Sequence, residues 1–340
     1  MAVPVTPTAQ MGYIGFLQLE NWGLTQSLFP IRFTSSDLNI TQNISAQDVI
    51  DGRVDRTVYM MEAIITEGTV AFPIIIDASG NFISSVWQAA VRRDNREGTD
   101  FSGELIHSGD IVVKYTTGRT YRFRRSKINS FTLTAAQGAA TTGSITFWGT
   151  TREATPVIQL PDYLTPARVL TWDQVRVYGF KGLATPPDPR NCSTFSTQFV
   201  RSCTITIENN LSRNYTFDPD ASLFPSNIST GKRNVTGSLE FQGWAPTEDL
   251  ADSNTQRCTS EETLRFEVIS SCSTGTTGQS DTGVRFARQM YGVIYRHQDI
   301  SSTMDVVTST VAWQAYAIED DNIDNIDGPQ PYQALDVTGV

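Results

Sequence analysis

The sequence predicts a mainly β protein made of two successive units, each with several strands and one short helix. Its 340 residues include many Thr, Ser, Val, Ile, Tyr and Phe, which favour strands, and the apolar content of 39% is that of a folded chain. Residues 203–207 (C-T-I-T-I) alternate apolar and polar side chains, as a strand with one buried face does. Two short strings also occur twice in one order, which indicates an internal duplication.

The repeated strings are both rich in strand-forming residues. Residues 128–134 (I-N-S-F-T-L-T) match 200–206 (V-R-S-C-T-I-T) at the apolar, Ser and Thr positions. Residues 142–149 (T-G-S-I-T-F-W-G) match 236–243 (T-G-S-L-E-F-Q-G) more closely. Either match alone is a weak signal. Because both keep the same order, with a longer connection in the second copy, they predict two related domains.

The segments around the repeated strings suggest where the domains begin and end. Residues 1–30 read as an extended N-terminal arm, and 156–168, with three prolines, as a linker. Domain 1 is then expected over 31–155 and domain 2 over 169–318. Residues 319–340 form an acidic C-terminal tail.

The charge of the chain is acidic and unevenly placed. The formal net charge is −10; residues 1–160 carry 13 Lys and Arg against 14 Asp and Glu, or −1, which leaves −9 for the rest. This balance argues against a protein that grips nucleic-acid phosphates. It is compatible with a protein past which a polyanion slides without sticking.

In the first half, a β hairpin is expected early in domain 1. Residues 36–55 read as a polar strand-and-turn region, and 56–67 with 69–76 as two strands joined at Glu67-Gly68. The run from 70 to 76 is nearly all apolar, which predicts burial on both faces.

A helix and three strands are expected next. In residues 81–93 the apolar period changes from two to that of a helix, because Phe82, Val86 and Ala90 fall on one helical face. Further strands of this half are expected at 111–115, 119–134 and 140–148. The second of them carries a basic run, for which we favour a solvated strand or a salt-bridged subunit contact over a nucleic-acid surface. This run consists of Arg119, Arg122, Arg124, Arg125 and Lys127.

The second half is expected to repeat the pattern of strands with one helix. The residues T-S-E-E at 259–262 are typical of a capping box, which predicts a short helix carrying Leu264, Phe266 and Val268. Strands of this half are expected at 172–180, 284–295 and 303–318.

No motif predicts catalysis, so we expect no enzyme and no cofactor or metal site. His107 and His297 are the two histidines, and neither has the spacing of a metal ligand. Asp218-Pro219-Asp220 offers oxygen ligands for calcium, but nothing in the pattern fixes the others. Without a signal peptide or a run of ~20 apolar residues, we expect synthesis in a cytosol and no membrane insertion.

Four cysteines lie in the second half, and their spacing lacks the close pairs of a zinc site. Reduced, partly buried thiols are the favoured interpretation. Disulfides formed after release from the cell are the alternative. The four are Cys192, Cys203, Cys258 and Cys272.

Around residues 203–239 the sequence resembles the tail tube proteins of tailed bacteriophages. The strand C-T-I-T-I-E-N-N at 203–210 ends in paired asparagines. After a connection, P-S-N-I-S-T-G-K-R-N-V-T-G-S-L at 225–239 follows the pattern P-x-x-I-x-x-G-x-R-x-V-T-G-S-L that is typical of that family. The resemblance covers about half of domain 2, and the matching strings at 128–149 suggest that domain 1 is a divergent copy.

The resemblance implies two tandem tube-type domains, each a β-sandwich or small barrel with one short helix and a long hairpin. It implies a major tail tube subunit of the virion, assembled in the host bacterial cytoplasm, whose rings stack around a lumen for DNA, as in the related hemolysin-coregulated protein tubes. Three two-domain chains would close a pseudo-sixfold ring; six chains are the alternative. Implied partners are further copies of the chain and sheath, baseplate and tail-terminator proteins, with DNA as passing cargo.

Two other functions compete with this interpretation. A baseplate or neck adaptor, or tube initiator, would use the same fold in a single ring. A β-sandwich glycan-binding module is suggested by tryptophans in or beside expected strands, although such residues more often pack in a core. These are Trp148, Trp172, Trp244 and Trp313.

Overall fold

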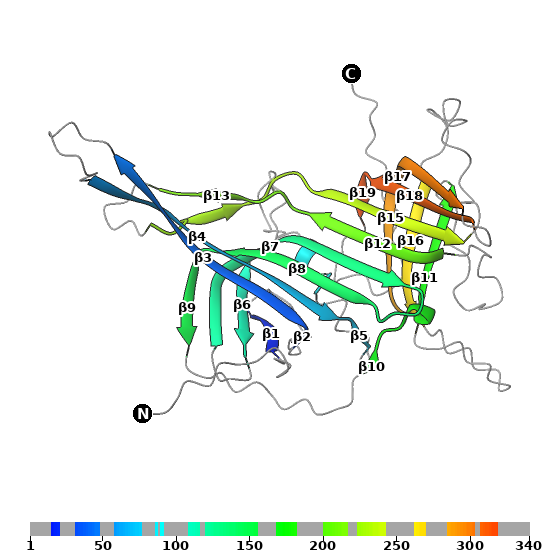
Figure 1. The fold of residues 1–340 in the computed structure, drawn as a ribbon, viewed down its shortest axis with the longest axis horizontal. Helices are drawn as coiled ribbons and strands as arrows, with labels where there is room; N and C mark the ends of the chain where they lie inside the picture. Colours follow the sequence, from blue (N-terminus) through cyan, green and yellow to red (C-terminus); the bar gives the residue numbers. More distant parts are fainter. Residues whose placement is uncertain are drawn as a thin grey trace, which may run out of the picture.

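The computed structural model confirms a mainly β fold with extensive antiparallel pairing (Figure 1). It describes residues 15–20, 31–47, 58–76, 86–87, 89–91, 108–115, 120–155, 168–181, 200–216, 223–242, 262–269, 284–302 and 307–318. The strands are β1 (Gly15–Glu20), β2 (Ile31–Phe33), β3 (Ser35–Gln47), β4 (Val58–Pro73), β5 (Ile75–Ile76), β6 (Gly109–Lys114), β7 (Thr120–Ala136), β8 (Thr142–Gly149), β9 (Thr151–Thr155), β10 (Arg168–Val169), β11 (Val175–Lys181), β12 (Val200–Glu208), β13 (Ser212–Asn214), β14 (Asn227–Ser229), β15 (Asn234–Gln242), β16 (Glu262–Ile269), β17 (Val284–Ser302), β18 (Val307–Ala315) and β19 (Ala317–Ile318).

Eight strands form a central sheet in the order β3-β4-β8-β7-β12-β15-β18-β17, with every neighbouring pair antiparallel. The long strands β7 and β17 leave this sheet at their N-terminal ends. There β7 pairs with β6 and β9, and β17 pairs with β16 and β19. In Figure 1 these flanking strands run across the direction of the central sheet.

The core lies on one face of the central sheet because apolar side chains alternate along its strands. On β7 and β8 the fully buried residues include Phe131, Leu133, Ile145 and Phe147, and on β12 they include Ile205 and Ile207. The intervening side chains are Ser, Thr and other polar residues on the opposite face. Alternation of period two thus separates a dry face from a polar face.

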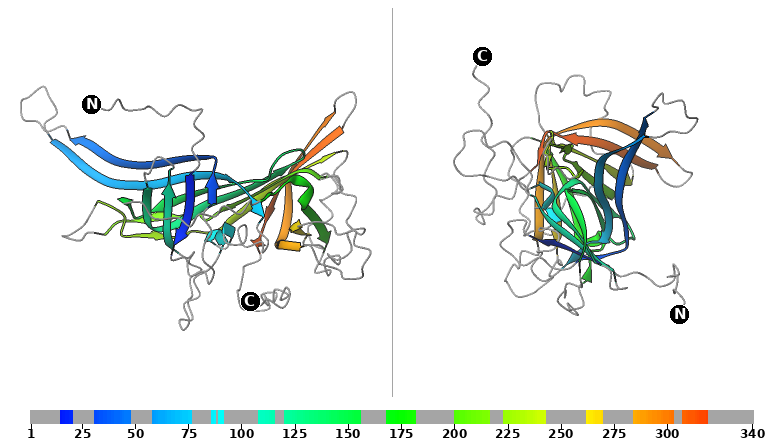
Figure 2. Two further views of the ribbon diagram at one scale, coloured as in Figure 1. Left: turned by 90° about the horizontal axis from the view of Figure 1, so that it is seen from below. Right: turned by 90° about the vertical axis from the view of Figure 1, so that its left-hand side faces the viewer.

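A short helix covers the core face, as the sequence predicts for the first half. Residues 86–87 and 89–91 are helical and buried. The ring of Trp87 meets Phe131 edge-on at 5.9 Å and Phe286 at 5.5 Å, so one side chain packs against strands of both halves. Figure 2 (left) shows this helix on the side of the sheet away from the β3–β4 hairpin.

The helix expected in the second half is a strand instead. Residues Glu262–Ile269 form β16, paired with β11 and β17. The prediction was wrong because Leu264, Phe266 and Val268 recur at every second position, which is the period of a strand, and all three are buried. The residues expected to open a strand at 172 form a 3₁₀ turn, η1 (Trp172–Gln174), before β11.

The early hairpin is also placed differently from the prediction. Strand β4 runs without a turn through Glu67 and Gly68, and the long hairpin is the pair β3–β4. The apolar run after residue 69 is not buried on both faces: Val70 and Phe72 are fully buried, whereas Thr69 is exposed. The glycine continues the strand because the ring of Phe147 occupies the space of its missing side chain.

Part of the expected N-terminal arm belongs to the sheet. Strand β1 lies within residues 1–30 and pairs with β2 and β6. Strand β10, at the end of the expected linker, pairs with β5. Strand pairing therefore connects residues of the expected arm and of the expected linker to strands of the expected domain 1.

Candidate functional surface

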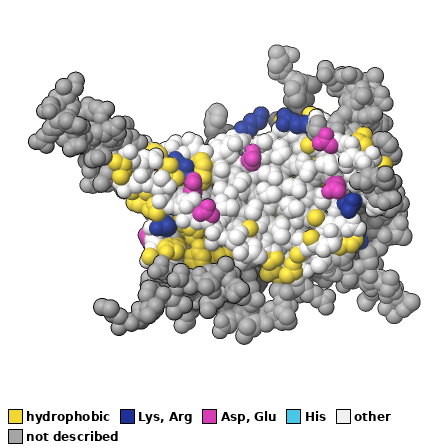
Figure 3. Space-filling model, in the orientation of Figure 1, with side chains coloured by type: hydrophobic (Ala, Val, Ile, Leu, Met, Phe, Trp, Pro, Cys, Tyr) yellow, Lys and Arg dark blue, Asp and Glu magenta, His cyan; other side chains and the backbone are white. Residues whose placement is uncertain are grey.

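The polar face of the central sheet is rich in hydroxyl groups. Figure 3 looks onto this face, where uncharged side chains and backbone predominate over the middle of the sheet. Hydroxyls bond across strands: Thr132 with Thr206 at 3.3 Å, and Thr69 with Thr146 at 3.2 Å. The hydroxyl residues of this face include Ser130, Thr132, Thr134, Ser144, Thr146, Thr204, Thr206, Thr236, Ser238, Thr308 and Thr310.

Five acidic side chains lie on this hydroxyl face, and two of them pair with arginines. Glu67 accepts a hydrogen bond from Arg213 at 2.8 Å, and Glu240 lies 3.8 Å from Arg201. The acidic side chains that strand register places on this face are Asp37, Glu67, Glu208, Glu240 and Asp299. A surface of this composition offers a phosphate chain few cationic partners.

Beside the sheet, Asn209 and Arg233 join the second half of the chain to the helix. The Asn209 side-chain amide donates to the carbonyls of Ala90 at 2.9 Å and Ile128 at 2.8 Å. Arg233 donates to the carbonyl of Val91 at 2.6 Å and to the Asn209 side-chain oxygen at 3.2 Å. Carbonyls at the end of helical residues lack partners within the helix, so these bonds satisfy them.

The backbone next to Asn209 turns sharply, which explains further residues of the sequence pattern. Asn210 adopts a left-handed conformation with φ of 47°, and its side chain donates to the carbonyl of Lys232 at 2.7 Å. A Cβ on Gly231 would lie 2.3 Å from the Asn210 carbonyl oxygen. The paired asparagines and the G-x-R segment are therefore parts of one junction.

The β13–β14 hairpin holds the long β3–β4 hairpin from the side. Arg213, on β13, bonds to Glu67 on β4, and its guanidinium lies 3.7 Å from the centre of the Trp148 ring. The amide of Ile64 donates to the carbonyl of Leu223 at 2.7 Å. These contacts support β4 near the point where the long hairpin leaves the body of the molecule (Figure 1).

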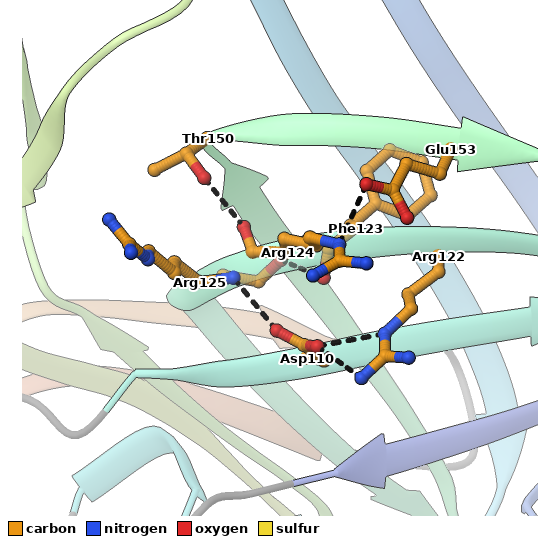
Figure 4. A network of polar contacts seen from close by, with 8 residues as sticks. Asp110, Arg122, Phe123, Arg124, Arg125, Thr150 and Glu153 are labelled. Carbon is orange, nitrogen blue, oxygen red and sulfur yellow. Dashed lines mark hydrogen bonds and ion pairs between the residues drawn. The ribbon is translucent and has the colours of Figure 1, made fainter.

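Two arginines of the basic run on β7, Arg122 and Arg124, form ion pairs within the chain (Figure 4). Arg122 pairs with Asp110 at 2.6 Å, and the backbone amide of Arg125 donates to the same carboxylate at 2.9 Å. Arg124 pairs with Glu153 at 2.7 Å. Arg125 has a left-handed backbone with φ of 45°, and Asp110 holds that bend.

The tryptophans do not form an exposed sugar-binding platform in the described part of the chain. Trp313 is buried in the core, and Trp148 is covered by Arg213. Trp172 is 41% exposed on its own turn. Trp244 lies outside the described residues.

Cys203 is buried and free, as expected for a reduced thiol, and burial raises its pKa to about 12.

Of the other residues singled out in the sequence, Lys127 is buried on β7. His297 lies on β17. Within the described residues no group of three or more His, Cys, Asp or Glu could hold a metal ion, and no helix is long and apolar enough to cross a membrane. Residues of the sequence predictions that lie outside the described part include Phe82, Cys192, Cys258, Cys272, His107, Arg119, Asp218 and Asp220.

The fold defines a β protein built around one extended antiparallel sheet with a dry face and a hydroxyl face. The family model for phage tail tube proteins matches residues 3–315, which is nearly the whole sequence. The chain belongs to the phage tail tube protein family, as the pattern around Asn209 and Arg233 predicted. No curated protein matches it. The family is a structural one of the virion tail, so the chain has a structural role in the tail tube.

Proposed function

We propose that the chain is the major subunit of the tail tube and that its hydroxyl face lines the lumen through which DNA passes. The observation that carries this proposal is the composition of that face: Thr and Ser predominate over the middle of the sheet, and strand register places five carboxylates on it. Hydroxyls bonded to one another across strands, such as Thr132 and Thr206, present no cation to a phosphate. The acidic groups repel DNA by their field, which lowers friction during ejection.

In this proposal the rings stack along the tube axis. Figure 2 shows the β3–β4 hairpin extending beyond the rest of the described strands, with Ile44 59% exposed on it. A hairpin that projects from one ring can contact the next, and burying an exposed isoleucine there favours stacking.

We further propose three chains per ring, with domains at 31–155 and 169–318 in six similar places. Support comes from two sets of strands within these bounds, β6-β7-β8-β4-β3 and β16-β17-β18-β15-β12, which have the same order of pairing. Strand β1, which precedes residue 31, lies beside the first set as β11 lies beside the second. Sheath, baseplate and tail-terminator proteins are the further partners expected of such a tube, which would be assembled in the cytoplasm of the host.

Electron microscopy of the purified protein tests the proposal, with class averages viewed down the ring axis. Stacked annuli with three chains in each ring are the expected result. Single rings that never stack would favour a baseplate or neck adaptor over a tube subunit as the function of the chain. A protein that stays monomeric and is retained on glycan resins would support the binding-module alternative.

A further inference from the structure

The central sheet ends in two strands that pair on one side only among the described strands. At one end β3 pairs with β4, and at the other residues 294–302 of β17 pair with β18. Ile40 on β3 is 42% exposed, and Ile300 on β17 is 48% exposed. Long edges that carry exposed apolar residues are templates for pairing with another chain.

A template for such pairing exists inside the chain, because the two sets of strands correspond in detail. The first set runs β1-β6-β7-β8-β4-β3, with β9 beside β7. The second set runs β11-β16-β17-β18-β15-β12, with β19 beside β17. Each strand of the first set thus has a counterpart in the second set. The two counterparts hold the same position in the order of pairing and the same position in the order along the chain.

Irregularities in the ladders match as well. On β7 the register with β8 skips one residue at Asn129, and on β17 the register with β18 skips one at Arg296. Four residues before each skip stands a residue with positive φ: Arg125 at 45° and Gly292 at 59°. Bulges are specific features of a ladder, so their agreement fixes which residues correspond.

The corresponding strands β4 and β15 carry similar sequences, G-T-V-A-F at 68–72 and G-S-L-E-F at 237–241. Gly68 makes room for the ring of Phe147, and Gly237 makes room for the ring of Trp313. This correspondence differs from that of the strings 128–134 and 200–206. Those strings lie side by side on β7 and β12, which hold different places in the two sets.

Within one chain the two sets meet where β12 pairs with β7. Ile205 lies opposite Leu133, and Ile207 lies opposite Phe131. All four side chains are fully buried. We call this β12–β7 pairing a joint. In the correspondence β3 is the counterpart of β12, and β17 is the counterpart of β7. Because β3 and β17 are the two end strands of the central sheet, each copy carries both strands from which a second joint of this kind can form with other copies.

The register of that second joint follows from the first. Ile205 lies opposite Gly237 and Leu38 lies opposite Gly68, so Leu38 matches Ile205. Counting from the matched bulges, Ile300 matches Leu133. Leu38 would then lie opposite Ile300, on the core face of both strands.

We propose that β3 of one copy pairs antiparallel with residues 297–302 of β17 in a second copy, with Leu38 opposite Ile300 and Asp37 opposite Ser301. The proposal deepens the tube function and rests on it for the identity of the partner. Pairing in this register places Leu38 against Ile300, and it places Ile40 opposite Gln298 and diagonal to Ile300. A slip by one residue would place Leu38 opposite Asp299 or Ser301, so that the core face of one copy would continue into the hydroxyl face of the other. Because the two edges differ, the joint is heterologous, and the ring of the proposed tube requires that its rotation closes after a whole number of copies.

A cysteine pair in the full-length protein tests the joint: Asp37→Cys combined with Ser301→Cys. Residues directly opposite in an antiparallel ladder have Cα atoms about 4.5–5.5 Å apart, which suits a disulfide. Under mild oxidation most of the chain should form covalent oligomers on a non-reducing gel, and the ladder should end at the number of chains per ring. Each single variant controls for native cysteines. Asp37→Cys with Ile300→Cys, whose second side chain points to the opposite face, controls for register.

Two results would overturn the joint: tubes that form in the microscope without crosslinking of the Asp37–Ser301 pair, or equal crosslinking of the Asp37–Ile300 control. Unchanged thermal unfolding of the variants ensures that they are folded. Crosslinked single rings that never stack would keep the joint and reject the tube subunit. Monomers that neither crosslink nor assemble at high concentration would reject both.

Discussion

Asn209 uses each hydrogen-bonding group of its side chain to hold two halves of the chain together. Both amide hydrogens go to buried carbonyls, those of Ala90 and Ile128, and the oxygen accepts from Arg233. Buried carbonyls without partners are costly. At the scale of single residues, the Asn209 side chain is therefore a position where a substitution leaves buried carbonyls without a donor.

Replacing Asn209 by alanine should lower the free energy of unfolding by about 1–3 kcal/mol, because two buried carbonyls lose their donor. Asn210→Gly is the matched control, since it removes a solvent-exposed hydrogen bond to the Lys232 carbonyl and glycine accepts the left-handed backbone at this position. Denaturant unfolding of both variants provides the measurement. Equal losses in the two variants would show that the buried amide has no special role.

The Cys203 thiol should resist alkylation in the native protein. Burial raises its pKa to about 12, so the reactive thiolate is absent at neutral pH. Since the folded pKa lies above the unfolded value of 9.0, this group contributes stability that is complete below pH 9 and is lost as pH rises toward 12. Mass spectrometry of the peptide containing Cys203, after alkylation with and without denaturant, checks this; rapid native labelling would contradict it.

At the scale of elements, glycines facing aromatic rings set the spacing of neighbouring strands. A Cβ on Gly68 would come within 2.5 Å of the Phe147 ring, and one on Gly237 within 2.4 Å of the Trp313 ring. Each ring fills the place of the absent side chain and brings β4 to β8 and β15 to β18 without a gap. An added methyl group would force the ring to move.

Gly68→Ala should destabilise the protein by about 1–3 kcal/mol through this overpacking. Combining it with Phe147→Leu should recover part of the loss, because the smaller side chain leaves room for the methyl group. A double-mutant cycle from unfolding free energies measures the coupling. Strict additivity of the two changes would mean that the ring and the glycine do not share the space.

Asp110 fixes the bend between the two parts of β7, and Asp110→Asn should cost about 1.5–3 kcal/mol because a half-buried, charge-assisted bond to Arg122 is lost. Glu153→Gln is the control: its pair with Arg124 is solvent-exposed and should contribute about 0–1 kcal/mol. Thermal unfolding of both variants compares them. A larger effect at Glu153 would refute the assignment.

Strand alternation and helix periodicity in the first half were readable from the sequence, because each is a local pattern. The β16 strand differs from the predicted helix because the T-S-E-E string before it is typical of a helix start, whereas Leu264 and Phe266 alternate with the period of a strand. The turn expected at Gly68 was wrong because a glycine beside an aromatic ring can continue a strand. Which ring faces it depends on a strand about eighty residues away, which no local pattern contains.

At the scale of the whole molecule, the family pattern around Asn209 was readable because its turn residues are specific, and the family match confirms it. The hydroxyl face was not predicted. Alternating Ser and Thr on one strand mean little until register aligns them across several strands. The similar strings 128–134 and 200–206 also do not identify corresponding strands. They lie on β7 and β12, which pair with each other and hold different places in the two sets.

Ile44→Asp should shorten tubes without preventing ring formation. Ile44 is 59% exposed on the projecting hairpin, so the change should leave monomer stability within about 0.5 kcal/mol of the original. Asn43→Asp, at the adjacent exposed position, controls for added charge. Tube lengths measured by electron microscopy at equal protein concentration give the readout, and unchanged lengths would remove the hairpin from stacking.

The β7–β12 pairing inside one chain has a kinetic consequence. That joint forms in a unimolecular step, at an effective concentration set by the chain itself, and does not weaken on dilution. In a three-chain ring only the joints between chains depend on subunit concentration, so half of the closure is complete before subunits meet. A chain with a damaged β3 edge and an intact β17 edge would still join a growing ring and then stop it, and would inhibit assembly at substoichiometric amounts.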